Sequence, residues 1–124
     1  MNLVDSSAWL EYFANGPNAK YFAPAIEAAE KLIVPSICVY EVFKRILQQR
    51  SEDAALQAVA AMKQGAVVAT DFTMSLNAAK ISVELKLPMA DSYIIACARQ
   101  YGAVIWTQDS DFDGLENVKF YKKK

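Results

Sequence analysis

The sequence predicts a single α/β domain spanning residues 1–124, with a sheet that is covered by helices on both faces. Short apolar runs, bounded by turn residues, alternate along the chain with longer amphipathic segments. Near-continuous apolar strands are typical of a parallel sheet that is buried on both sides, which gives a three-layer architecture. The chain has 124 residues, of which 54% are hydrophobic and 22% charged, so it can bury one core.

The first third of the chain carries the signals of two strands and two helices. The strands are short apolar runs, and Pro35 closes the second one. Ser6 or Ser7 can cap the first helix, which stops at an Asn-Gly-Pro turn, and the second helix is alanine-rich and amphipathic. The expected positions are a strand at 2–5, helices at 8–14 and 19–30, and a strand at 32–34.

The rest of the chain continues the alternation and brings the number of strands to five. Ser36 is the expected cap of the next helix, Pro88 stops a later helix, and Gly102 ends the last one. The expected positions are helices at 36–50 and 51–65, a strand at 66–69, helices at 72–87 and 90–101, and strands at 103–106 and 118–121.

The composition excludes several classes of enzyme. Histidine is absent, so a single chain has neither a Ser-His-Asp nor a Cys-His mechanism. The two cysteines, Cys38 and Cys97, lie in apolar surroundings without CxxC spacing. A zinc site needs about four nitrogen or sulfur ligands, which this chain does not supply, so both thiols are expected in the core.

Charge and hydropathy limit which partners the chain can have and where in the cell it is expected. The formal net charge is -1, which argues against non-specific binding to duplex nucleic acid but leaves room for a local RNA contact. Lys44, Arg45 and Arg50 lie close together in sequence. The three lysines at 122–124 are interpreted as a solvated segment rather than a binding arm. Without a signal peptide or a transmembrane run, the chain is expected to be cytoplasmic and away from the membrane.

Four carboxylates lie where apolar segments end or turn outward: Asp5 in NLVD, Glu41 in VYEVF, Asp91 in LPMADSYIIACA and Asp109 in VIWTQD. An acid inside or capping a hydrophobic run needs an explanation, because acids usually stay in solvent. Two of the four follow strands and two lie near the starts of helices, so all should converge at the carboxyl edge of the sheet. Ligands of open parallel sheets bind at this edge.

Each acid also has a simpler interpretation. Asp5 can cap a helix, Asp91 is favourable in a first helical turn, and Glu41 can pair with Lys44 or Arg45 on its own helix. Together, however, four neighbouring carboxylates would repel each other without a counter-ion. An all-oxygen ligand set suits Mg²⁺ or Mn²⁺, and such a site activates water for attack on a phosphodiester.

Three further residues are candidates for a supporting role. Ser6 and Thr107 can donate a hydrogen bond to a ligand carboxylate or to a metal-bound water. Asp111 is either an additional outer carboxylate or a solvated loop residue. The DxDxDG spacing from Asp109 onward is not an EF-hand, because no Glu lies six residues after Gly114.

The segments VDSSAWLEYF, PSICVYEVFKR, LPMADSYIIACARQYGAVIWTQDSDF and VKFY are spread along nearly the full chain. In type and order they resemble the PIN-domain family, in particular the VapC-type toxins of prokaryotic toxin–antitoxin pairs. The resemblance implies a five-stranded PIN-like fold and a Mg²⁺- or Mn²⁺-dependent ribonuclease. The family's ligand positions map onto Asp5, Glu41, Asp91 and Asp109, and its hydroxyl residue maps onto Thr107.

The resemblance also implies partners: an RNA substrate, a homodimer and a cognate antitoxin that lies in a groove and reaches the acidic pocket. Trp9, Tyr12 and Phe13 are candidates to line that groove, although a core-facing stripe explains Trp9 and Phe13 as well. Lys44 and Arg45 are candidate contacts for the phosphates of the RNA.

Two other functions stay open at this point. A response-regulator receiver has a similar length and an α/β sheet, with Asp71 after the third strand in the place of a phospho-acceptor. A receiver needs an adjacent acidic pair after its first strand, whereas Asp5 is followed by Ser6 and Ser7. The second alternative is a PIN-like fold that binds a protein or RNA without catalysis.

Overall fold

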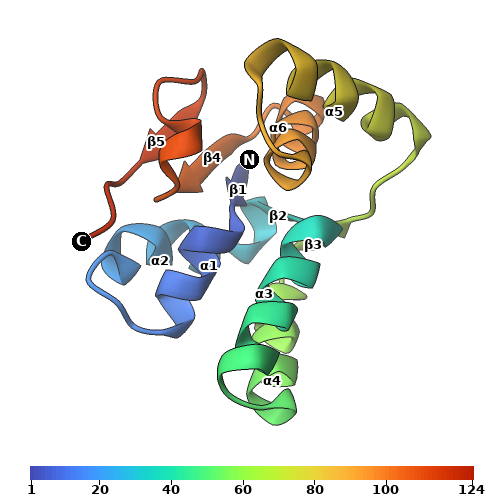
Figure 1. Cartoon of the computed structure of the whole chain (residues 1–124). Coiled ribbons are helices and arrows are strands. Elements are labelled where there is room, and N and C mark those ends of the chain that lie inside the picture. The colour runs from blue at the N-terminus through green and yellow to red at the C-terminus, as the bar shows by residue number, and fades with distance from the viewer.

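A computed structural model describes residues 1–124 and contains one five-stranded parallel sheet (Figure 1). The strands run in the order β3-β2-β1-β4-β5. Their bounds are β1 Asn2–Val4, β2 Leu32–Pro35, β3 Ala66–Val68, β4 Val104–Thr107 and β5 Val118–Phe120. The expected α/β fold with five parallel strands is confirmed.

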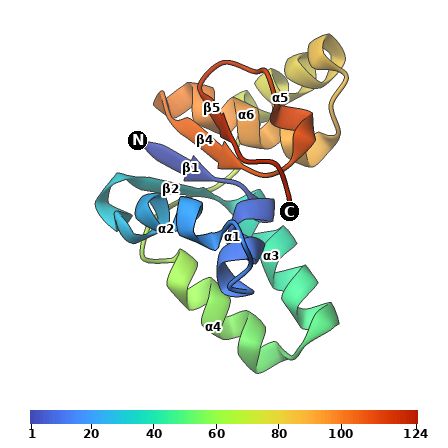
Figure 2. The ribbon, with the colours of Figure 1, turned by 90° about the vertical axis from the view of Figure 1, so that its left-hand side faces the viewer.

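Helices cover both faces of the sheet, which makes three layers. Helices α1 to α4 lie on one side of the strands, and α5 and α6 lie on the other (Figure 2). The bounds are α1 Ser6–Phe13, α2 Ala19–Glu27, α3 Ser36–Gln49, α4 Glu52–Met62, α5 Phe72–Leu85 and α6 Met89–Tyr101, with 3₁₀ turns at Ala29–Lys31 and Ser110–Phe112. No helix is long and apolar enough to cross a membrane.

The central strand explains why the apolar runs are nearly continuous. Leu3 of β1 pairs with Ile33 of β2 on one side and with Ile105 of β4 on the other, and all three side chains are buried. All four residues of β2 are buried as well. Cys38 and Cys97 are buried free thiols, as expected for small core residues.

The direction in which the sheet grows reverses between β1 and β4. From β1 the chain adds β2 and then β3 on one side, returns across the sheet, and adds β4 and β5 on the other side. Parallel sheets bind ligands at the carboxyl ends of the strands next to such a switch point. Asp5 follows β1 and Asp109 lies two residues beyond β4, so both acids stand at this position.

Several boundaries differ from the sequence prediction for local reasons. The helix expected at 8–14 begins at Ser6, because Asp5 rather than a serine accepts the capping hydrogen bond from the Ala8 amide. The segment 19–30 breaks at Ala28, whose ψ of 65° leaves the helical region, and a 3₁₀ turn follows. Ser36 is the first residue of its helix, and Pro35 takes the cap position without a side-chain hydrogen bond.

Candidate metal centre

The Asp5 side chain is almost fully buried, with 2% of its surface exposed, and both of its carboxylate oxygens accept hydrogen bonds from the protein. Its Oδ1 accepts from the Ala8 amide at 3.0 Å and from the Ser7 hydroxyl at 2.8 Å. Its Oδ2 accepts from the Thr107 hydroxyl at 2.7 Å. The carboxylate therefore caps α1 and is held in one orientation at the switch point, so the capping role and a site role coexist.

Thr107 links the two strand-end acids. While its Oγ1 donates to Asp5, it accepts from the Asp109 amide at 2.9 Å. Thr107 is fully buried at the end of β4. Because β1 and β4 pair in parallel register, this single hydroxyl fixes the loop that carries Asp109 against the residue that ends β1.

Three carboxylates gather beside this link. Asp91, Asp109 and Asp111 each offer an oxygen, and these oxygens all lie within 4.8 Å of one another. Asp91 comes from the first turn of α6, and Asp109 caps the 3₁₀ turn by accepting from the Asp111 amide at 2.9 Å. The 3₁₀ turn places Asp111, an exposed residue, next to Asp91 and Asp109, so that its carboxylate completes the three-carboxylate group.

The pKa values of two of the acids are raised by burial and, to a smaller extent, by the neighbouring carboxylates. Burial is the main cause that raises the pKa of Asp5 from 3.8 to about 6, with a smaller contribution from Asp109, against the lowering effect of its hydrogen bonds. Burial also raises the pKa of Asp91 from 3.8 to about 7, followed by repulsion from Asp109 and Asp111. An acid pair with such values is short of positive charge.

Glu41 does not belong to the three-carboxylate group, and it is linked instead to Ser6, the residue that follows Asp5. The Ser6 hydroxyl donates to Glu41 Oε1 at 2.6 Å. The thiol of Cys38, one turn earlier on α3, is fully buried. Burial is the main cause that raises its pKa, and the negative charges of Asp5 and Glu41 raise it further. Lys44, a candidate partner of Glu41, instead holds its ammonium 5.6 Å from the centre of the Tyr40 ring.

The arrangement fits a divalent cation. All the converging ligand atoms are carboxylate oxygens, the donor type that Mg²⁺ and Mn²⁺ prefer. After burial, repulsion from Asp109 and Asp111 contributes to the raised pKa of Asp91, and a cation among these oxygens would relieve that repulsion. Protein nitrogen or sulfur donors are absent from the three-carboxylate group, which disfavours zinc.

Ser7 gains an importance that the sequence analysis did not give it, and Asp111, a candidate for a supporting role, lies in the three-carboxylate group. Ser7 donates to Asp5, accepts from the Gln108 amide at 3.2 Å, and lies 3.4 Å from Thr107 Oγ1. The repeated serine after Asp5 was the available signal, but either serine could be taken as a simple cap. Asp111 was left between two interpretations, because nothing in the sequence reveals a 3₁₀ turn that folds it back.

One candidate groove residue is excluded. Trp9 has no exposed surface and stacks on Phe13 with ring centres 5.5 Å apart, so it belongs to the core. Tyr12 and Phe13 are only partly buried, and the Tyr12 hydroxyl donates to Glu27 at 3.2 Å.

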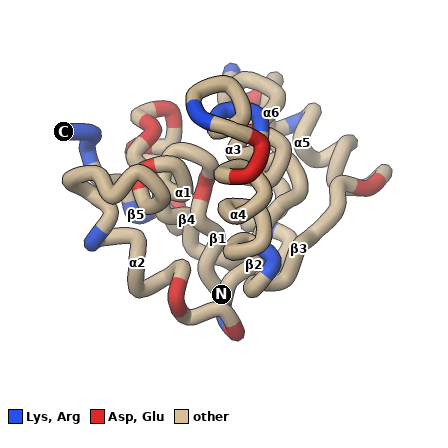
Figure 3. Tube along the Cα trace, turned by 90° about the horizontal axis from the view of Figure 1, so that it is seen from below, with Lys and Arg blue, Asp and Glu red and all other residues tan.

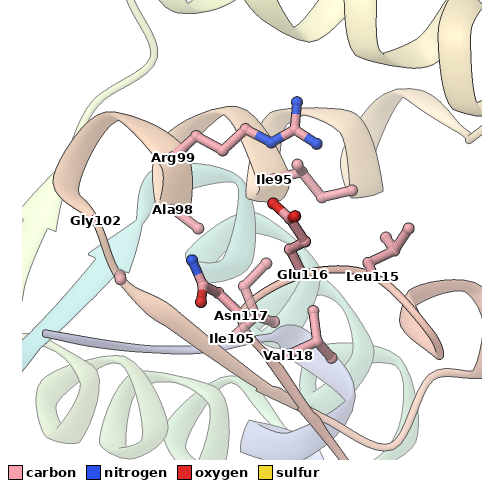
Figure 4. Close-up of a pocket in the computed structure, with 10 residues that line it drawn as sticks. Ile95, Ala98, Arg99, Gly102, Ile105, Leu115, Glu116, Asn117 and Val118 are labelled. Atoms are coloured by element: carbon pink, nitrogen blue, oxygen red, sulfur yellow. The ribbon is translucent and has the colours of Figure 1, made fainter.

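A separate cavity of about 170 Å³ lies between α6, β4 and the segment before β5 (Figure 4). Its wall is mostly apolar, and Arg99 and Glu116 extend over it (Figure 4). Gly102 and Asn117, which precede β4 and β5, place the cavity at the amino edge of these strands. It is therefore distinct from the carboxylate cluster at the opposite edge.

Solved structures share this fold over nearly the full chain. A toxin–antitoxin complex from Klebsiella pneumoniae matches with a TM-score of 0.84 and 18% identity, covering 99% of this chain and 100% of that chain. VapC20 of Mycobacterium tuberculosis, a toxin that cleaves the sarcin–ricin loop, matches with a TM-score of 0.79 and 17% identity, covering 94% and 95%. At sequence identities this low, these matches establish a shared fold and nothing further.

A third similar structure is VapBC2 from Rickettsia felis, bound to a DNA fragment from its promoter. The TM-score is 0.74 at 10% identity, and the match covers 98% of this chain and 97% of that chain. No curated protein sequence matches the chain.

The sequence itself matches a family model. The model described as PIN domain aligns with residues 3–118, a range that runs from β1 to the first residue of β5 and includes all the acids of the cluster. The resemblance expected from the motifs is confirmed: this chain belongs to the PIN domain family, in the fold shared with VapC-type toxins.

Proposed function

We propose that this chain is a metal-dependent endoribonuclease that serves as the toxin of a toxin–antitoxin pair. The observation that carries the proposal is the convergence of carboxylates at the switch point, where three oxygens from Asp91, Asp109 and Asp111 lie within 4.8 Å of one another. Membership of the PIN domain family and the folds of VapC20 and the Klebsiella complex support it.

In this proposal Asp5, Asp91 and Asp109 hold Mg²⁺ or Mn²⁺, and Glu41 and Asp111 complete the pocket directly or through water. A divalent ion bound there would polarise the phosphate and lower the pKa of the attacking water. A cation held there would favour the ionised form of Asp91, whose pKa of about 7 leaves it partly protonated at neutral pH, and would add to the stabilisation of the Asp5 carboxylate.

The remaining residues position these groups. The Thr107 and Ser7 hydroxyls hold the Asp5 carboxylate in one orientation, and Thr107 also fixes the backbone at Asp109. Ser6 holds Glu41 toward the same edge. Water is the nucleophile and carboxylates are its neighbours, so the reaction needs no histidine.

The proposed partners are an RNA substrate, a cognate antitoxin and a second copy of the chain. The similar structures include a toxin–antitoxin complex and a toxin that cleaves the sarcin–ricin loop, which supports the first two. An RNA substrate of this kind places the proposed activity in the cytoplasm.

The test is cleavage of single-stranded RNA by the purified chain with Mg²⁺ or Mn²⁺. Asp109→Asn should lower the rate by at least about a hundredfold, because even the outer partners of metal ligands cost about 10–100-fold when they are removed. Asp53→Asn, on the exposed first turn of α4, is the matched control and should cleave like the wild type. Equal rates for wild type and Asp109→Asn would refute the assignment.

A receiver function is disfavoured by the sheet. Receivers have the strand order 2-1-3-4-5, whereas β1 lies at the centre here and β3 at the edge. Asp71 is an exposed helix cap whose Oδ1 accepts from the Met74 amide at 2.8 Å, and it lies beyond the edge strand. The other alternative, a catalytically silent binding module, predicts RNA binding without cleavage under the same assay.

A further inference from the structure

Two hollows on the surface join into one groove beside the carboxylate cluster. One has a volume of about 360 Å³ and lies between α1 and α3, and the other, of about 510 Å³, lies against the end of β5. Ser7, Gln108 and Lys123 line both hollows, so the two are continuous: Ser7 and Gln108 form their common floor, and Lys123 lies on a common wall. The joined hollows are here called the basic groove.

Cations stand on both walls of the basic groove. Arg45 and Arg50 come from α3, and Lys122 and Lys123 come from the segment after β5. All four side chains are exposed. Figure 3 shows the C-terminal end of the chain, coloured as Lys, at one side of the molecule. The only acids that line the groove are Glu11 and Asp109, and Glu11 already accepts from the Asn18 amide at 2.8 Å.

The segment that carries the lysines is held in place by a buried side chain. Asn18 has no exposed surface, and its amide nitrogen donates to the Lys122 carbonyl and to Gln108 Oε1, each at 3.0 Å. The Tyr121 ring also stacks on Tyr21 with ring centres 4.7 Å apart. The backbone of the lysine segment is thereby tied to the residue that follows Thr107, so these lysines are placed beside the site.

The basic groove opens directly onto the carboxylates. Ser7 in its floor donates to Asp5 at 2.8 Å, and Asp109 lines the second hollow. A polyanion that approaches this cluster is repelled by the acids, and the chain has a net charge of -1, so no overall field compensates. Local cations on both sides of the path supply that compensation.

We propose that the basic groove binds the phosphate backbone of single-stranded RNA next to the cleavage site, with Arg45 and Arg50 on one side and Lys122 and Lys123 on the other. The inference rests on the proposed nuclease function and names how the substrate is held. The exposed amide group of Gln49, on the α3 side of the groove, adds a polar contact that suits a ribose-phosphate backbone read without sequence preference.

The experiment measures binding of a labelled single-stranded RNA in EDTA, at several salt concentrations, so that it does not depend on cleavage. Each lost phosphate contact should reduce the slope of log affinity against log salt by about 0.7. Lys123→Gln and Arg50→Gln should each weaken binding and lower the slope by this amount, and the double variant should lower it by about twice as much. Lys63→Gln, next to the amino end of β3, removes the same charge outside the groove and should leave the slope unchanged.

The outcomes separate this inference from the nuclease assignment. Wild-type slopes in both groove variants would overturn the groove, even if the wild type cleaves RNA with Mg²⁺. Loss of slope in both variants supports the groove, even if no cleavage is found. Binding of an oligoglutamate peptide that equals RNA binding, with the same dependence on Lys123 and Arg50, would overturn the inference and assign the groove to an acidic protein segment.

Discussion

At the scale of single residues, Thr107 is the non-acidic side chain that connects the two acids at the ends of β1 and β4. One buried hydroxyl donates to Asp5 and accepts from the Asp109 amide, and the two bonds join the loops after β1 and β4. Thr107 was expected to assist the carboxylates because it precedes the Asp109 loop in a hydroxyl position of the motif. That one hydroxyl serves both acids depends on the pairing of β1 with β4, which no local pattern contains.

Thr107→Val keeps the shape of the side chain and removes both hydrogen bonds. The buried Asp5 Oδ2 and the Asp109 amide lose a partner, so the free energy of unfolding should fall by about 1–3 kcal/mol. Divalent-metal affinity should fall about 10–100-fold, as for other groups that orient metal ligands. Chemical denaturation and metal titration check the two effects. Thr107→Ser, which retains the hydroxyl, should recover most of both, and a Val variant with wild-type affinity would contradict the linking role.

The raised pKa values of Asp5 and Asp91 predict how stability depends on pH in the metal-free protein. A carboxyl whose pKa is higher in the folded state than its ordinary 3.8 favours folding at low pH, and this contribution is lost as pH rises through about 6 for Asp5 and about 7 for Asp91. In EDTA, the melting temperature should therefore fall as the pH rises from about 4 to about 7 and should level off above that range.

Two comparisons sharpen the pH measurement. Mg²⁺ should restore stability chiefly at the upper end of the range, where it replaces the missing positive charge. Asp91→Asn removes one of the titrating groups, so its melting temperature should vary less with pH than that of the wild type. A wild-type profile that is flat over this range, or an Asp91→Asn profile identical to that of the wild type, would show that the pKa values of these carboxyls are not raised in the folded state.

At the scale of elements, the signals that end helices were better guides than those that begin them. Gly102 ends α6 with a φ of 61°, as expected from a glycine after an apolar periodic segment. Helix starts were harder, because several serines and acids compete for each cap. Asp5 caps α1 in place of Ser6 or Ser7, and Pro35 occupies the position expected for Ser36.

Gly102→Ala tests the strain at this helix end in isolation. A Cβ built at Gly102 meets no atom within 4 Å, so the only cost is the left-handed backbone, about 1–2 kcal/mol. Thermal or chemical unfolding should show this loss. Lys86, which ends α5 with a φ of 55°, offers the reverse change: Lys86→Gly should not destabilise. A Gly102→Ala variant as stable as the wild type would show that the helix end relaxes.

At the scale of the whole molecule, α5 presents an apolar face that no other part of the chain covers. Phe72 is 80% exposed, Leu76 53% and Val83 82%, and their spacing of four and seven residues puts them on one side of the helix. Large apolar residues that gather in this way mark a protein interface. The family resemblance implies a homodimer, and this face is where we expect it.

Val83→Glu should convert the dimer into a monomer, because it places an unpaired charge in an apolar contact. Light scattering on the purified chain checks the mass directly. Leu56→Glu, at a comparably exposed apolar position on α4, is the control and should leave the dimer intact. A dimer that survives Val83→Glu and Phe72→Glu would place the interface elsewhere.

Most of the whole-molecule architecture was predictable, because local hydrophobic patterns indicate buried parallel strands and their alternation with helices. The strand order was not, yet it decides the function: the reversal between β1 and β4 brings Asp5 and Asp109 to one position and separates this fold from a receiver. The sequence does not reveal the basic groove either: its pattern favours a solvated segment for the lysines at 122–124, whereas Asn18 holds that segment beside Gln108.

The central claim is that the acids at the switch point form one site for a divalent cation. Titration of Mn²⁺ into the metal-free chain, followed by electron paramagnetic resonance, measures that binding without reference to any RNA. Wild type should bind Mn²⁺, Asp91→Asn and Asp109→Asn should each lose most of the affinity, and Asp53→Asn should bind as the wild type does. Wild-type binding by both Asp91→Asn and Asp109→Asn, or no binding by the wild type, would contradict the account.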